Sequence, residues 1–158
     1  MATARGRMLS WTISKDGRVA RLSCPLAKLL YSWMIAHADN LGRMPGEPAE
    51  VRATVIPREP EVTDEWVAVW LAEMHTLGLI VWFEFDGMRY VQLTGWDKHQ
   101  RLTGNMRRKS DYPEPPAAMM AEASRKSCWP NENGRETNGV QTACERGISG
   151  VHPASVLK

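Results

Sequence analysis

The sequence predicts an α+β domain in which three helices precede a two-stranded β-hairpin. Two observations indicate this class. Apolar residues recur at spacings of three and four in successive segments before residue 78, as on the buried face of a helix. Directly afterwards, two runs rich in β-branched and aromatic residues flank an Asp-Gly pair at 86–87, which is a strong short-range signal for a hairpin.

The first helix is predicted within residues 22–42. Ser23 is the expected N-cap, and Pro25 suits the first turn because its missing N–H would have no partner there. The sequence Asp-Asn-Leu-Gly at 39–42 is a turn signature that ends the helix. The residues that recur at helical spacing are Leu26, Leu29, Leu30, Trp33 and His37.

A short second helix is predicted at residues 48–55. Pro57 and Pro60 follow it and prevent its continuation, because proline lacks the backbone N–H that a helix interior needs. The apolar face expected for this helix consists of Val51, Val55 and Ile56.

The third helix is predicted at residues 64–77. Thr63 is the expected N-cap, and Asp64 and Glu65 place negative charge beside the positive end of the helix dipole. Gly78 follows the last apolar position and closes the helix. Its buried stripe is expected to contain Val67, Trp70, Leu71, Met74 and Leu77.

Two strands are predicted at 79–85 and 88–93, joined by the Asp-Gly turn. Because side chains alternate along a strand, the second run has two distinct faces. One face carries Met88, Tyr90 and Gln92, and the other carries Arg89, Val91 and Leu93. At the other end of the domain, residues 8–14 are expected to add a short strand or an N-terminal arm.

The order of helix, helix, helix and hairpin predicts a winged helix-turn-helix, with the hairpin as its wing. We predict that this domain occupies residues 1–116 and ends in the stiff sequence Pro-Glu-Pro-Pro at 113–116. From residue 130 onward Gly, Asn, Ser and Pro dominate, so residues 117–158 are predicted to form a flexible, disordered C-terminal tail. Within that tail, residues 117–126 have the composition of a marginal helix.

Four stretches carry a resemblance to a known family. They are HADNLGRMPG at 37–46, GLIVWFEFDG at 78–87, WDKHQ at 96–100 and, after a basic run, YPEP at 112–115. Over residues 8–116 the chain resembles bacteriophage and prophage replisome organisers, which have an N-terminal winged-helix domain and are related in style to DnaD-type primosomal proteins. The resemblance implies DNA binding at a phage origin and recruitment of the host helicase or its loader. It also implies self-association, without a defined stoichiometry.

The expected DNA contacts do not lie on the third helix. In a helix-turn-helix the second helix of the pair reads base edges, but residues 64–77 contain three carboxylates and no Lys or Arg. We predict instead that a basic strap at 98–109, which follows the wing, binds the phosphate backbone. The predicted contacts are Arg89, Lys98, His99, Gln100, Arg101, Arg107, Arg108 and Lys109, and the patch would extend to Lys15, Arg18 and Arg21.

Two other interpretations of these features stay open. The basic strap would also suit a solvated exit from the domain, since runs of charge commonly serve that purpose. The acidic third helix would suit a transcription regulator or a protein-docking winged helix that meets a basic partner. Trp96, which precedes the strap, is expected to pack against the helical core and anchor it.

The remaining composition predicts neither an enzyme nor a cofactor-binding protein. The chain has four widely separated histidines and three cysteines with no C-x-x-C pair, so no metal site is expected. No phosphate-cradling loop or nucleophile motif is present in the sequence. Cys24 is expected to be a buried free thiol. Without a visible signal peptide or a long apolar run, we expect a soluble cytoplasmic protein that has no membrane partner.

Overall fold

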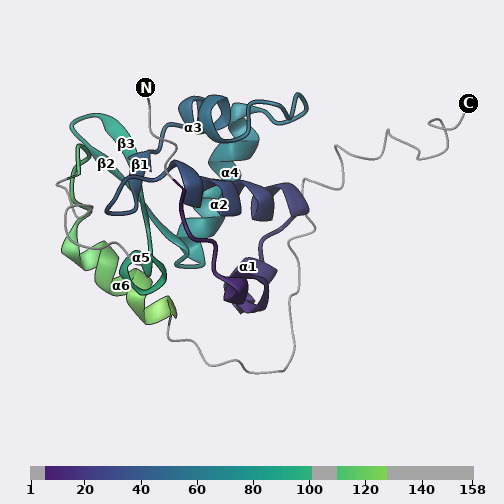
Figure 1. Ribbon diagram of the computed structural model, residues 1–158. Helices are drawn as coiled ribbons and strands as arrows, with labels where there is room; N and C mark the ends of the chain where they lie inside the picture. Colours follow the sequence, from purple (N-terminus) through teal and green to yellow (C-terminus); the bar gives the residue numbers. More distant parts are fainter. Residues whose placement is uncertain (1–5, 101–109, 128–158) are drawn as a thin grey trace, which may run out of the picture.

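The computed structural model describes residues 6–100 and 110–127. It is an α+β fold in which helices pack on one face of a three-stranded antiparallel sheet of order β1-β3-β2, and one further helix covers the other face (Figure 1). The elements are η1 (Trp11–Lys15), α1 (Gly17–Ala20), α2 (Pro25–His37), β1 (Arg43–Pro45), α3 (Pro48–Val55), α4 (Asp64–Thr76), β2 (Ile80–Phe85), β3 (Met88–Leu93), α5 (Trp96–His99) and α6 (Ala117–Ser127).

Helix α2 begins one residue later than predicted. Its N-cap is Cys24, whose Sγ accepts a hydrogen bond from the N–H of Ala27 at 3.4 Å, so the prediction of Ser23 as the cap is wrong. The buried residues of α2 are Ala27, Leu30 and Met34. Trp33, which the spacing grouped with Leu30, is 42% exposed. The apolar stripe predicted for α2 is therefore displaced around the helix from the face that is actually buried.

Helices α3 and α4 confirm the sequence prediction closely. The residues expected on the apolar face of α3 are all buried. At the start of α4, the Thr63 hydroxyl oxygen accepts from the N–H of Trp66 at 3.4 Å, and Gly78 follows the helix with a φ of +70°. The left-handed conformation of Gly78 turns the chain directly into β2. The buried residues of α4 are Val67, Trp70, Leu71 and Met74.

The hairpin is also confirmed. Asp86 and Gly87 both have positive φ, +53° and +73°, as a tight turn between twisted strands requires, and Phe85 pairs with Met88 on either side of it. Strand β1 was not predicted, because a three-residue segment that contains an arginine and a proline lacks strand composition. It pairs antiparallel with β3 and places Met44 opposite Val91 in the core.

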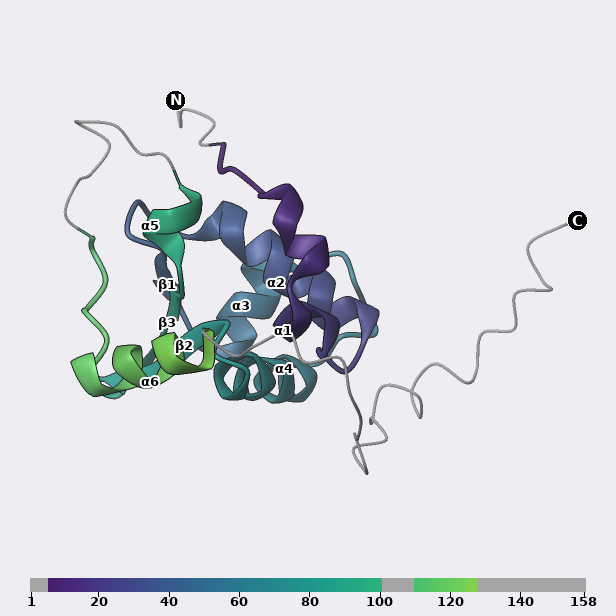
Figure 2. The same cartoon turned by 90° about the horizontal axis from the view of Figure 1, so that it is seen from below.

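Helix α6 packs on the face of the sheet that lies away from the helical core (Figures 1 and 2). Its Ala123 is buried against Val81 and Phe83, and a Cβ built on Gly78 would lie 2.8 Å from the Cβ of Lys126. The folded part therefore extends at least to Ser127, beyond the predicted end at residue 116. A weak helix forms here because the outer face of β2 is apolar and needs a cover. The rest of the predicted tail, 128–158, lies outside the described residues.

The structure also tests two smaller predictions, one on residues 8–14 and one on Cys24. Residues 8–14 do not form a strand, since Trp11–Lys15 is a turn of 3₁₀ helix. Cys24 is a buried free thiol, as expected. Among the helices of the described residues, none is long and apolar enough to cross a membrane.

Candidate nucleic-acid interface

Two of the three carboxylates of α4, those of Asp64 and Glu73, are engaged within the domain. Asp64 accepts a hydrogen bond from Nε of Arg52 at 2.5 Å, and Glu73 accepts two from Ser23, each at 2.9 Å. The side chains that α4 presents to solvent are Glu65, Val69, Ala72 and Thr76. This face has no cation and one carboxylate, so it offers no charge-assisted donor to a phosphate or to guanine.

Arg89 lies exposed on β3, close to the hairpin turn. Its guanidinium carbon lies 5.0 Å from the centroid of the Trp82 ring, and Trp82 is itself fixed by a 2.9 Å hydrogen bond from its indole N–H to the carbonyl of Gly46. Stacking on an aromatic face leaves the edge of a guanidinium, which carries its N–H donors, free to bind an anion. Glu84 is the cross-strand neighbour of Arg89, so the hairpin does not have a purely positive surface.

Lys98 and His99 are exposed on the short helix α5, which follows β3. The anchor of this helix is Trp96, which is 6% exposed and belongs to the core, as predicted. Its indole N–H donates to the carbonyl of Asn40 at 3.0 Å. A Cβ on Gly42 would lie 2.7 Å from the Trp96 ring, so a glycine is required beneath it. The two basic side chains are thus held at a defined place at the end of the sheet.

Gln100 serves a different purpose from the one predicted. Its side chain is buried, with Oε1 accepting from the N–H of Met8 at 3.1 Å and Nε2 donating to the carbonyl of Met8 at 2.8 Å. Gln100 is only 8% exposed, and its amide oxygen and one amide N–H are both bound to the backbone of Met8, so it is not presented to a nucleic acid. Gln100 therefore fastens the N-terminal segment to α5, and we remove it from the candidate contacts.

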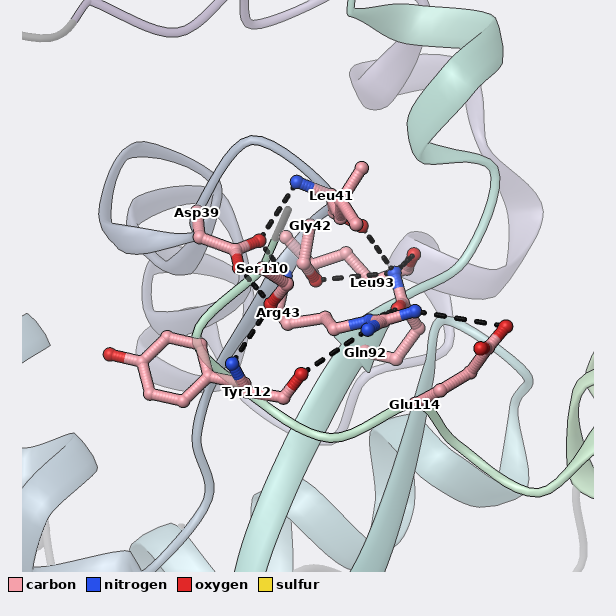
Figure 3. A network of polar contacts seen from close by, with 9 residues as sticks. All are labelled: Asp39, Leu41, Gly42, Arg43, Gln92, Leu93, Ser110, Tyr112 and Glu114. Atoms are coloured by element: carbon pink, nitrogen blue, oxygen red, sulfur yellow. Dashed lines mark hydrogen bonds and ion pairs between the residues drawn. The ribbon is translucent and has the colours of Figure 1, made fainter. Parts of the chain in front are cut away.

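Arg101, Arg107, Arg108 and Lys109 lie outside the described residues. From Ser110 onward the chain again contacts the folded domain. The Ser110 hydroxyl donates to Asp39, and the guanidinium of Arg43 donates to the carbonyl of Tyr112 at 3.2 Å and pairs with Glu114 at 3.9 Å (Figure 3). Because this segment and α6 both pack on the sheet, the basic strap is not the exit from the domain.

Figure 3 also shows why Arg43 is unavailable to a ligand. Its Nε donates at 3.0 Å to Oε1 of Gln92, and the amide nitrogen of Gln92 donates to the carbonyl of Leu41 at 2.8 Å. Both oxygens of Asp39 are used, one by the N–H groups of Leu41 and Arg43 and the other by Ser110. This network of hydrogen bonds joins β1, β3 and the segment that leads to α6, so its role is structural.

The N-terminal cations differ in whether their charge is already paired within the domain. Arg18 donates to both carboxylate oxygens of Asp16, at 2.8 and 3.1 Å, and to the carbonyl of Gly78. Burial alone would raise the pKa of Asp16, but hydrogen bonds from Arg18 and its charge hold that pKa below the ordinary 3.8. Arg18 is therefore a structural cation. Lys15 and Arg21 are exposed.

The described residues contain no group of three or more His, Cys, Asp or Glu side chains that would hold a metal ion. Comparisons of the chain with protein-family models, curated proteins and solved structures found no match. The candidate interface therefore rests on the geometry of this chain: Arg89 on β3, and Lys98 and His99 on α5.

Proposed function

We propose that the protein is a winged-helix DNA-binding protein that acts in phage or prophage replication initiation as a replisome organiser. The element order α2, β1, α3, α4, β2, β3 supports a winged helix, because a short strand between the first two helices completes a three-stranded sheet with the wing. The resemblance of residues 8–116 to replisome organisers supports the replication role. Recruitment of the host helicase or its loader, and self-association, belong to the same proposal.

The observation that carries DNA binding is the placement of α5. Trp96 fixes this helix to the core, and Lys98 and His99 stand exposed on it, directly before a stretch that supplies four further cations. Lysine and arginine side chains bind phosphates without reading sequence, because binding releases the counterions condensed on DNA. The protein accordingly contacts the DNA backbone through α5, the basic strap and Arg89, while α4 stays away from the major groove.

A salt titration with the full chain tests this proposal. If the five strap cations each meet a phosphate, the logarithm of affinity for duplex DNA falls against the logarithm of salt with a slope of about −4.5, from about −0.9 per phosphate. Changing Arg107, Arg108 and Lys109 together to Ala should reduce that slope by nearly three units and weaken all DNA sequences about equally.

The matched control removes three cations elsewhere, with Lys28, Arg58 and Arg125 changed to Ala. It has the same net charge as the strap variant and should keep the wild-type slope. Equal slopes for wild type and the strap variant, in a protein that still melts cooperatively, would exclude the strap as the DNA contact.

A protein-docking function is the second candidate, and the exposed face of α4 favours it. Val69 is 53% exposed there, between Glu65 and Ala72, on a helix with no Lys or Arg. An apolar and acidic stripe suits a basic protein surface better than DNA. Glu65→Lys should abolish capture of purified helicase or loader if docking through this face is correct. The same variant should bind DNA at least as tightly as wild type if α4 merely faces solvent.

A further inference from the structure

A cleft of about 100 Å³ lies between the N-terminal segment and the end of the sheet. Residues of the N-terminal segment and residues of β3 and α5 line it together. Ser10 and Thr12 line the cleft from η1 and its N-cap, and Thr94, Lys98 and His99 line it from the opposite side. The paired hydrogen bonds between Gln100 and Met8 hold these two sides together. The cleft is therefore a built feature of the fold.

Tyr31, on α2, is partly buried and is one of the residues that line the cleft. Burial raises the pKa of Tyr31 to about 12, so its hydroxyl keeps its proton well above physiological pH. A neutral phenol in the wall of the cleft can donate a hydrogen bond to an acceptor on a ligand there.

Trp11 stands next to this cleft, between the lining residues Ser10 and Thr12. It is 73% exposed, the most exposed large apolar side chain of the described residues. Lys15 Nζ lies 4.6 Å from the centroid of its ring. An exposed indole beside a lysine has the two parts of a single-strand binding site, a surface on which a base stacks and a cation for the neighbouring phosphate.

We propose that this cleft and Trp11 together bind single-stranded DNA. One base stacks on Trp11, the next enters the cleft toward Tyr31, and Lys15 and Lys98 meet the phosphates from the two sides. This inference rests on the proposed DNA-binding function and adds to it the form of DNA that is preferred. Paired DNA does not fit the site, because its bases are stacked on one another and the cleft is far too small for a duplex.

The charges around the cleft are compatible with this ligand. Asp16 lines it, but its carboxylate is bound on both oxygens by Arg18. Asp97 is exposed on the same helix as Lys98 and is not one of the lining residues. Lys98 lines the cleft and Lys15 lies against the Trp11 ring beside it, and neither forms an ion pair with any described residue.

The test compares two exposed tryptophans in the full chain. Binding of a twenty-nucleotide oligothymidine and of a duplex of the same length is measured by fluorescence anisotropy for wild type, Trp11→Ala, Trp11→Phe and Trp33→Ala. Trp11→Ala should weaken the oligothymidine complex about tenfold and leave the duplex complex unchanged, since one lost base stack is of that order. Trp11→Phe should recover most of the loss. Trp33→Ala, which removes an exposed indole on α2, should change neither affinity.

Three results would overturn the inference. If Trp11→Ala binds oligothymidine as wild type does, or loses both forms of DNA equally, the stacking site does not exist although DNA binding does. Equal losses for Trp11→Ala and Trp33→Ala would also reject it. If the wild-type protein binds neither form of DNA at low salt, the proposed function itself fails, and the site fails with it.

Discussion

Glu73, in the middle of α4, binds Ser23, which lies just before α2. One carboxylate oxygen accepts from the Ser23 N–H and the other from its hydroxyl, both at 2.9 Å. This pair explains why Ser23 is not the cap of α2, because its hydroxyl points to Glu73 and the thiol of Cys24 takes the capping position. The same pair shows that an acidic residue of α4 serves the fold.

We predict that Glu73→Lys destabilises the domain. The change leaves the half-buried N–H and hydroxyl of Ser23 without an acceptor, which costs roughly 1–3 kcal/mol. Glu73→Gln keeps one acceptor and should lose less, and Glu65→Lys should lose less than Glu73→Lys because it changes only an exposed charge in the first turn of α4. Chemical denaturation of the three variants measures the ranking. A Glu73→Lys protein as stable as Glu65→Lys would show that the Ser23 contact contributes nothing.

Removing α6 should destabilise the domain. A chain that stops at residue 116 uncovers Val81 and Phe83, and at about 1.5–3 kcal/mol for each large apolar side chain the loss should reach about 3–6 kcal/mol if both become fully exposed. A chain that stops at Ser127 keeps this contact and should melt close to the full-length protein. Thermal unfolding of the two truncated chains decides the matter. Equal melting temperatures would mean that α6 packs without stabilising the sheet.

Trp70 should be among the most sensitive core positions. It is fully buried and stacks on Trp66, with ring centroids 6.1 Å apart, so Trp70→Ala should cost about 3–5 kcal/mol. Its indole N–H is buried and has no partner among the described residues. Trp70→Phe removes that unpaired donor and keeps an aromatic ring, so it should be much milder than Ala. Urea unfolding measures both, and similar losses for Phe and Ala would contradict the assignment.

Tyr31 should make the domain sensitive to alkali. Because burial raises its pKa from 10.0 to about 12, the folded state holds the phenol proton more tightly than the unfolded chain does. The stabilisation is fully present below pH 10 and is lost as the pH rises toward 12, by about 2–3 kcal/mol. Tyr31→Phe cannot ionise and should flatten this part of the stability profile. If Tyr31→Phe loses stability as steeply as wild type when the pH rises from 10 to 12, another group causes that loss.

The elements that the sequence predicts best are those with local causes. Asp86-Gly87 fixes the hairpin by its own turn conformation, and Thr63 caps α4 three residues away from the N–H that it binds. Both signals lie within a few residues of the structure they produce, so a pattern search finds them.

The features that sequence reasoning missed depend on contacts between distant segments. Strand β1 exists because its residues pair with β3, and α6 exists on the apolar outer face of β2. The partner of Gln100 is Met8, 92 positions away. No local pattern reveals such a pairing, which is why Gln100 resembled one more polar member of a basic run. Arg89 shares a strand face with the buried Val91 and is exposed because it lies beside the hairpin turn, while Lys98 and His99 are exposed on the short helix α5.

The two fastenings on either side of the basic strap have a thermodynamic consequence. Gln100 is fixed to Met8, and Ser110 to Asp39, so the nine residues between them are joined to the folded domain at both ends. Because the fold itself brings Gln100 and Ser110 to fixed places, the entropy of closing the chain between them is lost when the domain folds and does not enter the free energy of a later binding step.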